Sequence, residues 1–400
     1  MRVLLIHNSY RQRGGEDAVF EAERDLLIHN GCDVYVHHVS NDDILDINRM
    51  SLALKTLWNR DQYKVIQKEL REIGPDVAHF HNTMPLVSPA GYYAAHRAHV
   101  PVVQTLHNYR LICPSALLFR DGAVCEECVG RSITTPAIRH RCYRDSRSAT
   151  AAITAMLALH RARGTYQKRI DQYIALTDFA REKYIKGGLP ADRITVKPNF
   201  LADDPGAGRG ARNGALFVGR LTPEKGIEIL LEAMRRRADD VQLTIIGDGP
   251  LKRDVMNAAA ADARITYAGA LDRDTVLKHM RKAEVLAFPS LWYEGMPMTI
   301  VEAYACGTPV LANDIGSMQS IVASQRTGRL LPPGDIDAWS KALFEPDPKL
   351  PTYGKAARAV FETQYSAQQN YAQLMTIYER VTDTQGPARR VDEHVKAPTC

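Results

Sequence analysis

Short apolar segments alternate with longer segments of helical periodicity along most of the chain. In the first half the apolar segments are residues 2–7, 33–39, 76–81, 102–107 and 172–177. Runs this apolar, separated by helices, are typical of parallel strands buried on both faces. Right-handed crossovers between them predict a doubly wound sheet.

The alternation stops at residues 200–214, which are rich in Gly, Ala and charge and have no periodicity. It restarts with apolar segments at 215–219, 241–247, 264–269, 285–290 and 309–312. We therefore predict two α/β domains, residues 1–200 and 201–353, joined by a linker and facing a cleft. Ligands of open α/β sheets bind beyond the carboxyl ends of the strands, so functional residues are expected just after strands.

The composition narrows the class of protein to which the chain can belong. The 400 residues are 45% hydrophobic and 24% charged, as in soluble globular proteins, and a net charge of +5 is too small to identify a partner. No apolar run reaches the roughly 18 residues of a transmembrane helix, and the N-terminus is predicted to be a strand rather than a signal peptide. We expect a cytoplasmic protein whose seven cysteines are free thiols or metal ligands.

The segment PSLWYEGMPMTIVEAYACGTPV, residues 289–310, places Glu294 before a predicted helix and Glu302 inside it, with the helix beginning at Pro297. Free amides at a helix N-terminus bind phosphate, and the carboxylates can accept hydrogen bonds from sugar and ribose hydroxyls. The expected amides are near Met296, Met298 and Thr299. A pair of glutamates alone arises by chance in any charged protein, so the context carries the prediction.

Two further strand ends resemble phosphate or nucleotide sites. In FVGRLTPEKG, Arg220 can bind two phosphate oxygens and Lys225 can add a charge, although a solvated loop with surface cations explains the pattern as well. In IIGDGPL, Gly247 can let a base or ribose lie against the backbone, although a tight turn is an equal explanation.

Together, GRLTPEKG, GDGP and EGMPMTIVEAYACGTPV resemble glycosyltransferase family 4, whose fold is GT-B, two Rossmann-like doubly wound domains facing a central cleft. The resemblance implies that the second domain binds a GDP- or UDP-linked sugar, with the diphosphate on Arg220 and Lys225. It implies Glu294 at the donor sugar and Glu302 at the ribose. It also implies a retaining reaction that requires no metal or other cofactor, because cations and helix amides stabilise the leaving diphosphate.

The resemblance extends to the first domain and the end of the chain. Gly14 and Gly15 form a loop after the first strand that can approach the transferred phosphate or the acceptor, and His107 resembles the cleft histidine near the reacting sugar. A single histidine among 13 is otherwise explained by packing. The helical pattern at 354–382 is expected to cross back to the first domain, and 383–400 to be disordered.

Four cysteines fall within a short insertion, residues 113–142. Cys125 and Cys128 have the two-residue gap of a zinc knuckle, and Cys113 and Cys142 complete a set that can close a tetrahedral structural zinc site. The alternatives are unrelated core thiols and a redox pair at Cys125 and Cys128.

A basic segment follows at 131–169, where only Asp145 opposes nine cations. They are Arg131, Arg139, Arg141, Arg144, Arg147, Arg161, Arg163, Lys168 and Arg169. A basic, partly apolar helix there would suit the anionic inner face of a membrane, and the alternative is an ordinary helix with a solvated edge. No nucleic-acid partner is expected, because no aromatic-interleaved basic motif is present.

The leading hypothesis is a retaining hexosyltransferase that acts on a glycan or lipid-linked glycan acceptor in bacterial surface polysaccharide synthesis. The alternatives are a GT-B sugar-nucleotide epimerase or hydrolase and a catalytically idle sugar-nucleotide-binding scaffold. Epimerases and hydrolases of this fold lack the paired glutamates, and Arg220, Lys225, Glu294 and Glu302 argue against an idle scaffold.

Overall fold

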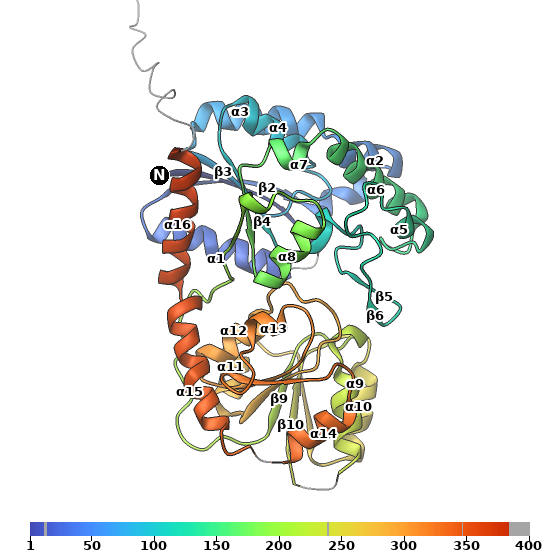
Figure 1. The fold of residues 1–400 in the computed structure, drawn as a ribbon, viewed down its shortest axis with the longest axis vertical. Helices are drawn as coiled ribbons and strands as arrows, with labels where there is room; N and C mark the ends of the chain where they lie inside the picture. Colours follow the sequence, from blue (N-terminus) through green and yellow to red (C-terminus); the bar gives the residue numbers. More distant parts are fainter. Residues whose placement is uncertain (12–13, 238–239, 346, 384–400) are drawn as a thin grey trace, which may run out of the picture.

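The computed structural model describes residues 1–11, 14–237, 240–345 and 347–383. They form two α/β domains stacked end to end, each with a parallel six-stranded sheet (Figure 1). The first sheet has the order β2-β1-β3-β4-β7-β8 and the second β11-β10-β9-β12-β13-β14. This arrangement confirms the predicted fold of two doubly wound α/β domains, each built on one of these sheets.

The first sheet consists of β1 (Arg2–Ser9), β2 (Asp33–Ser40), β3 (Val77–Phe80), β4 (Val102–Leu106), β7 (Gln172–Ala175) and β8 (Ile194–Val196). Its helices are α1 (Gly15–His29), α2 (Arg49–Leu57), α3 (Arg60–Ile73), α4 (Ala90–Arg97), α5 (Thr135–Arg139), α6 (Arg147–Ala162), α7 (Thr165–Lys168) and α8 (Asp178–Lys186). The cysteine-bearing insertion contains the hairpin β5 (Phe119–Arg120) and β6 (Ala123–Val124) as well as α5. The predicted strands of this domain lie within a few residues of those observed.

The second sheet consists of β9 (Ala215–Val218), β10 (Leu243–Ile246), β11 (Ile265–Gly269), β12 (Val285–Phe288), β13 (Val310–Asn313) and β14 (Gly328–Leu331). Its helices are α9 (Ile227–Arg235), α10 (Lys252–Ala261), α11 (Arg273–Lys282), α12 (Met298–Ala305), α13 (Met318–Ile321) and α14 (Ile336–Phe344). All pairings within the two large sheets are parallel, so the carboxyl ends of the strands share one edge in each domain.

The sequence pattern missed the edge strands β8 and β14. Both are short and partly exposed, so neither makes the continuous apolar run that marks a central strand. In β14 the first residue is Gly328, where a Cβ would lie 1.9 Å from the carbonyl oxygen of Val310. This glycine lets the edge strand approach β13, although glycine is otherwise a poor strand residue.

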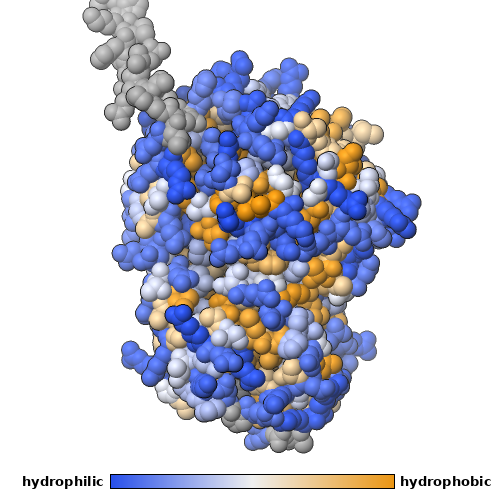
Figure 2. All heavy atoms as spheres, viewed as in Figure 1, coloured by the Kyte–Doolittle hydropathy of each residue, from blue (hydrophilic) through white to orange (hydrophobic). Residues whose placement is uncertain are grey.

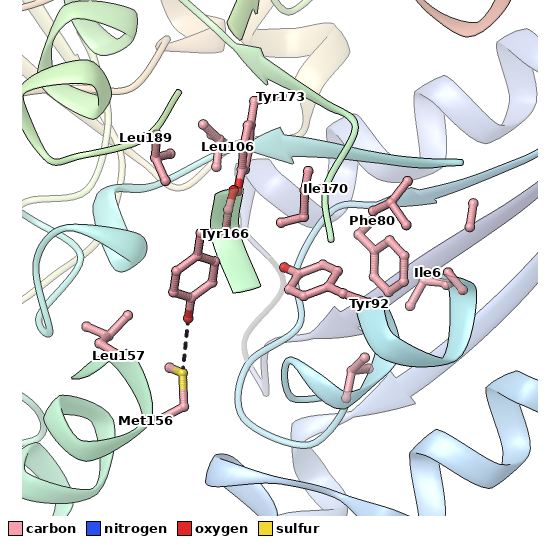
Figure 3. Close-up of a cluster of buried hydrophobic side chains, with 14 of the residues drawn as sticks. Ile6, Phe80, Tyr92, Leu106, Met156, Leu157, Tyr166, Ile170, Tyr173 and Leu189 are labelled. Atoms are coloured by element: carbon pink, nitrogen blue, oxygen red, sulfur yellow. Dashed lines mark hydrogen bonds between the residues drawn. The ribbon is translucent and has the colours of Figure 1, made fainter. Parts of the chain in front are cut away.

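The core of the first domain packs large aromatic side chains against its sheet (Figure 3). Tyr92, Tyr166 and Tyr173 are each 1% exposed or less. Each buried hydroxyl finds a partner: Tyr92 donates to Gln104, Tyr166 to the Met156 sulfur at 3.3 Å, and Tyr173 to the carbonyl of Tyr166. The aromatic rings add apolar burial while their polar ends are satisfied, as buried tyrosines require.

The end of the chain differs from the single helix expected at 354–382. Helix α15 (Leu350–Val360) packs on α12 of the second domain, so the expected domain boundary at 353 falls inside it. A π-helical segment, Phe361–Tyr365, then leads into α16 (Ala367–Asp383), which packs on the first domain (Figure 1). The crossing therefore occurs after α15. The prediction of disorder for 383–400 falls, except for Asp383, outside the described residues.

Candidate functional site

The loop between β12 and α12 carries a buried ion pair. Glu294 is 6% exposed, and its Oε1 accepts hydrogen bonds from Lys225 Nζ at 2.6 Å and from Ser290 Oγ at 2.8 Å. Lys225 comes from the loop after β9, the strand next to β12 in the sheet. Two of the predicted donor residues therefore meet at the carboxyl edge of the second sheet.

The same loop approaches His107, which follows β4 of the first domain. A Cβ on Gly295 would lie 3.0 Å from the His107 carbonyl oxygen, so the two domains nearly touch here. Ser317 Oγ donates to the Glu294 carbonyl at 2.6 Å and lies 3.2 Å from Thr177 Oγ1 of the first domain. Through these contacts the backbone of His107 lies next to the loop that carries Glu294, and these are the two residues predicted to be catalytic.

His107 is half-buried and lies beside the buried residue His81. Its Nε2 lies 2.9 Å from His81 Nδ1, and His81 Nε2 lies 3.2 Å from Glu23 Oε1. Burial, together with the neighbouring imidazoles, lowers the pKa of His107 well below its usual value and that of His81 to about 3. Both rings are therefore neutral near pH 7.

Within the part of the chain that the structure describes, no hydrogen bond or ion pair joins Arg220 or Glu302 to the ion pair of Lys225 and Glu294. The guanidinium of Arg220 is 67% exposed and lies 3.6 Å from Glu224. Glu302 is mostly buried, accepts a hydrogen bond from Arg273 Nε at 3.3 Å, and has a pKa raised by burial. An exposed arginine next to a buried ion pair leaves a charged side chain free to turn toward an anionic ligand.

The start of α12 differs by one residue from the prediction. Pro297 is the N-cap, so Met298 and Thr299 are the first helical residues and carry free amides. Met296 is 7% exposed, and its sulfur and carbonyl accept hydrogen bonds from Asn199 at 3.1 and 3.3 Å. Its side chain thus anchors the linker rather than facing a ligand.

Two glycines, Gly247 and Gly15, were predicted to let a ligand approach the backbone, and the structure places them differently. Gly247 has φ +149°, and a Cβ there would lie 1.9 Å from the carbonyl oxygen of Gly219, so this glycine is needed for backbone packing. Gly15 is the first residue of α1 rather than part of the preceding loop, and a Cβ there would meet no atom of the described residues within 4 Å.

Glu16 was missed by the sequence analysis. Its carboxylate accepts a hydrogen bond from Asn108 Nδ2 at 3.1 Å, its buried Oε1 has no hydrogen-bond partner among the described residues, and burial raises its pKa to about 7. Glu16 follows Gly15 and Asn108 follows His107, so both are adjacent in sequence to predicted site residues. Their contact across 92 positions was not visible in the sequence.

Two groups of residues resemble metal ligands. Glu23, His79 and His81 have ligand atoms within 4.8 Å of one another, but Lys197 Nζ donates to Glu23 at 2.9 Å and already supplies a cation. The four predicted zinc ligands, Cys113, Cys125, Cys128 and Cys142, line one small cavity. Burial, and after it the charges of the other thiols, raise the pKa of Cys128 to about 11.

No helix in the described ranges is both long and apolar enough to cross a membrane. The basic segment 131–169 contains α5, α6 and α7, and α6 packs on α2. Its buried face includes Ile153, Met156 and Leu157, so α6 belongs to the domain core as well as to the basic surface.

Comparisons with known proteins identify the family and the fold. The family model described as Glycosyltransferase Family 4 matches residues 14–204, and the one described as Glycosyl transferases group 1 matches 212–345. Phosphatidyl-myo-inositol mannosyltransferase of Mycolicibacterium smegmatis is 32% identical over 234 residues, or 54% of this chain and 59% of that protein. The putative teichuronic acid biosynthesis glycosyltransferase TuaC of Bacillus subtilis is 25% identical over 84% of this chain and 75% of that protein.

The alignments with the mycobacterial relatives take in 59% and 61% of the relatives' own length, so this chain spans about three fifths of them. Among solved structures, HepE of Anabaena in complex with UDP has a TM-score of 0.65 at 17% identity, covering 96% of this chain and 99% of that one. The two family matches adjoin along the sequence and include both domains. The chain therefore belongs to glycosyltransferase family 4 and has the GT-B fold.

Proposed function

We propose that this chain is a retaining glycosyltransferase that moves a hexose from a nucleoside diphosphate sugar to a glycan or lipid-linked glycan acceptor. The observation that carries the proposal is the approach of the Glu294 loop to His107 at the carboxyl edges of both sheets. A donor in the second domain and an acceptor in the first would meet there. The relatives named for a phosphatidylinositol acceptor and for teichuronic acid support a role in surface polysaccharide or glycolipid synthesis.

The donor is proposed to be UDP- or GDP-linked. HepE, which shares the fold, has been solved with UDP and with UDP-glucose, which supports a nucleotide-sugar donor. In this chain Arg220, Lys225 and the first amides of α12 would hold the diphosphate, and Glu302 the ribose. These cations and amides would stabilise the leaving diphosphate electrostatically, so that catalysis needs no metal ion.

Glu294 is proposed to bind the donor sugar after exchanging its partner. When phosphate oxygens draw Lys225 away, the Glu294 carboxylate becomes free to accept hydrogen bonds from sugar hydroxyls. Neutral His107 would contribute a hydrogen bond rather than a charge at the reacting carbon. In a retaining reaction of this type, the leaving phosphate takes the proton of the acceptor hydroxyl.

The first experiment is a thermal-shift titration with UDP, GDP, ADP, dTDP and CDP on wild type, Arg220→Ala and Arg235→Ala. Arg235 is an equally exposed cation on α9, outside the proposed site, and serves as the matched control. A nucleotide at about 100 times its Kd adds roughly 2.7 kcal/mol of stability. We expect a shift with one nucleotide that persists in Arg235→Ala and disappears in Arg220→Ala.

Transfer of labelled sugar to lipid-linked acceptors then separates the proposal from its alternatives. Product whose anomeric configuration matches the donor supports retention. Release of free sugar or an epimerised nucleotide sugar would indicate a hydrolase or epimerase, and nucleotide binding without turnover would indicate a scaffold. No shift with any nucleotide would overturn the donor site itself.

We further propose that the first domain binds the inner surface of an anionic membrane. Met50 and Leu54 on α2 are 72% and 61% exposed, and α2 packs beside basic α6. Figure 2 shows apolar atoms on this part of the first domain, at the upper right. Flotation with phosphatidylglycerol vesicles should recover wild type and lose Met50→Ser/Leu54→Ser, whereas Met256→Ser, exposed on α10, should behave as wild type. Equal recovery of all three would contradict this surface.

A further inference from the structure

The thiols of four cysteines surround a cavity at the side of the first domain. Cys113, Cys125, Cys128 and Cys142 line it together with Ser115, Phe119, Arg120 and Ala137. Its volume is about 10 Å³, about the room of a single water-sized particle. Cys113 and Cys128 are each 7% exposed, so the cavity is largely closed to solvent.

Local backbone structure brings these cysteines together. Asp121 and Gly122 have φ of +53° and +78°, which turns the chain between β5 and β6 and returns Cys125 toward the domain. The amide of Cys125 donates to the carbonyl of Leu118 at 2.8 Å, and the amide of Cys142 donates to that of Ala137 at 3.1 Å. Positions separated by up to 29 residues in sequence are thus fixed around one point by hydrogen bonds that involve no thiol.

We propose that Cys113, Cys125, Cys128 and Cys142 bind one structural zinc ion, and that this ion fixes the position of the Glu294 loop through Glu126. Each thiol would release its proton to solvent and bind the ion as a thiolate. Four thiolates and one Zn²⁺ leave two negative charges, and the Arg120 guanidinium, which also pairs with Glu127, lies at the cavity beside them.

The thiols must draw together to bind the ion. In a tetrahedral site with Zn–S near 2.3 Å, the sulfur atoms are about 3.8 Å apart. In the structure no three of these sulfur atoms all lie within 4.8 Å of one another, and Cys113 Sγ lies 3.1 Å from Ser115 Oγ instead. Because hydrogen bonds already set the backbone around the cavity, we expect the thiols to turn inward when the ion binds.

Glu126 connects this site to the second domain. It stands between Cys125 and Cys128, and its Oε1 accepts hydrogen bonds from Lys183 Nζ at 2.5 Å and from Tyr293 Oη at 3.0 Å. Tyr293 directly precedes Glu294. An ion that holds the two flanking cysteines therefore also holds the carboxylate to which the donor loop is attached. Glu126 is thus a positioning residue, and this second part of the inference rests on the proposed function of Glu294.

Metal content tests the first part independently of activity. Protein purified under reducing conditions without a metal-affinity column should contain one zinc per chain, as measured by inductively coupled plasma mass spectrometry. Cys125→Ser/Cys128→Ser should lose it, whereas Cys32→Ser, a buried cysteine of the same domain, should retain it. Wild-type protein without zinc, or with a disulfide between Cys125 and Cys128, would overturn the site.

Cobalt substitution keeps the test valid if the double variant fails to fold. Wild-type protein refolded with Co²⁺ should show the intense charge-transfer absorption of tetrahedral thiolate ligands, with all four cysteines protected from alkylation. Absorption typical of octahedral oxygen ligands, or four freely alkylated thiols, would contradict the proposal.

Hydrogen exchange tests the connection to the donor loop. Removal of zinc and Glu126→Gln should each speed amide exchange in residues 289–297 at least several-fold. Glu127→Gln is the matched control, because Glu127 lies in the same knuckle but contacts Arg120 rather than the second domain. Unchanged exchange at 289–297 after zinc removal would overturn the coupling and leave the zinc site standing. Loss of nucleotide binding is a separate measurement, so failure of the proposed function is distinguishable.

Discussion

Lys225 Nζ lies 2.6 Å from Glu294 Oε1, and the two side chains are only 16% and 7% exposed. The ammonium also lies over the Phe288 and Trp292 rings, at 5.8 and 5.4 Å from their centroids. A largely buried ion pair is strongly destabilising when one partner is removed. The pair therefore holds together the loops after β9 and β12 while leaving Lys225 available to a ligand of higher negative charge.

Lys225→Met should destabilise the protein by about 2 kcal/mol, because Glu294 then keeps a buried charge with only Ser290 as a donor. Chemical denaturation measures this loss, and the nucleotide-induced thermal shift should fall in the same variant. Adding Glu294→Gln should recover part of the stability. Lys341→Met, an exposed lysine on α14, is the control and should change stability by less than about 0.5 kcal/mol. Equal effects of the two lysine variants would contradict a buried pair.

His81 should remain neutral in the folded protein at pH 5. Burial lowers its pKa from 6.5 to about 3, and lowers the pKa of His107 as well, whereas the unfolded chain binds protons below about pH 6.5. Stability conferred by the neutral His81 ring is therefore present above pH 6.5 and falls as the pH drops toward 3, by about 1.4 kcal/mol per pH unit. Histidine NMR signals of wild type and His107→Gln identify the two rings. Protonation of His81 between pH 7.5 and 5 would refute the prediction.

Glu16 should give the opposite pH dependence. Burial raises its pKa from 4.5 to about 7, so the folded state keeps a proton that the unfolded chain has lost. Its contribution to stability is present below pH 4.5 and decreases, by about 1.4 kcal/mol per pH unit, as the pH rises toward 7. Glu16→Gln should therefore gain stability relative to wild type at pH 8 compared with pH 5. A difference that is the same at both pH values would show that Glu16 titrates normally.

Lys197 should be essential for the stability of the first domain. Its ammonium donates to Glu23 Oε2 at 2.9 Å and to Asn370 Oδ1 of α16 at 3.0 Å, and the side chains of Lys197 and Glu23 are 4% and 1% exposed. Lys197→Met should cost about 3–5 kcal/mol in unfolding free energy, because it leaves a buried carboxylate without its cation. Lys197→Met/Glu23→Gln should be less destabilised. A double variant as unstable as the single one would show that the lost packing, not the charge, is responsible.

The sequence predicted the central strands and the edge strands β2 and β11, but not the edge strands β8 and β14. Central parallel strands such as β1 and β12 are buried at almost every position, so their apolar runs are visible without structural information. The edge strand β14 contains Gly328 and a half-buried arginine, and its pairing depends on a close approach to β13 that no local pattern encodes. The break between α15 and α16 was missed because helical periodicity continues through the π-helical turn.

In the candidate site, too, the sequence predicted some residues and could not predict others. Glu294, Lys225 and His107 follow strands, and the parallel topology places such residues along one edge of each sheet. The contact of Glu16 with Asn108 and that of Glu126 with Tyr293 join positions 92 and 167 residues apart. Such contacts depend on how loops and domains pack, so motif spacing could not identify them. Met296 lies in the predicted motif, but packing turns its side chain toward Asn199.

The two passages of the chain between the domains run side by side. The amide of Leu201 donates to the carbonyl of Tyr365 at 3.0 Å, and Asn370 Nδ2 donates to the carbonyl of Pro198 at 2.8 Å. Both passages lie on the side of α15 and α16, whereas β5 and β6 lie on the opposite side (Figure 1). Away from these passages the domains are also joined by the hydrogen bond from Tyr293 to Glu126 and by the packing of the Tyr293 ring against Phe179, with centroids 4.6 Å apart. A motion that separated the domains about the paired passages would therefore have to release Tyr293, the residue directly before Glu294.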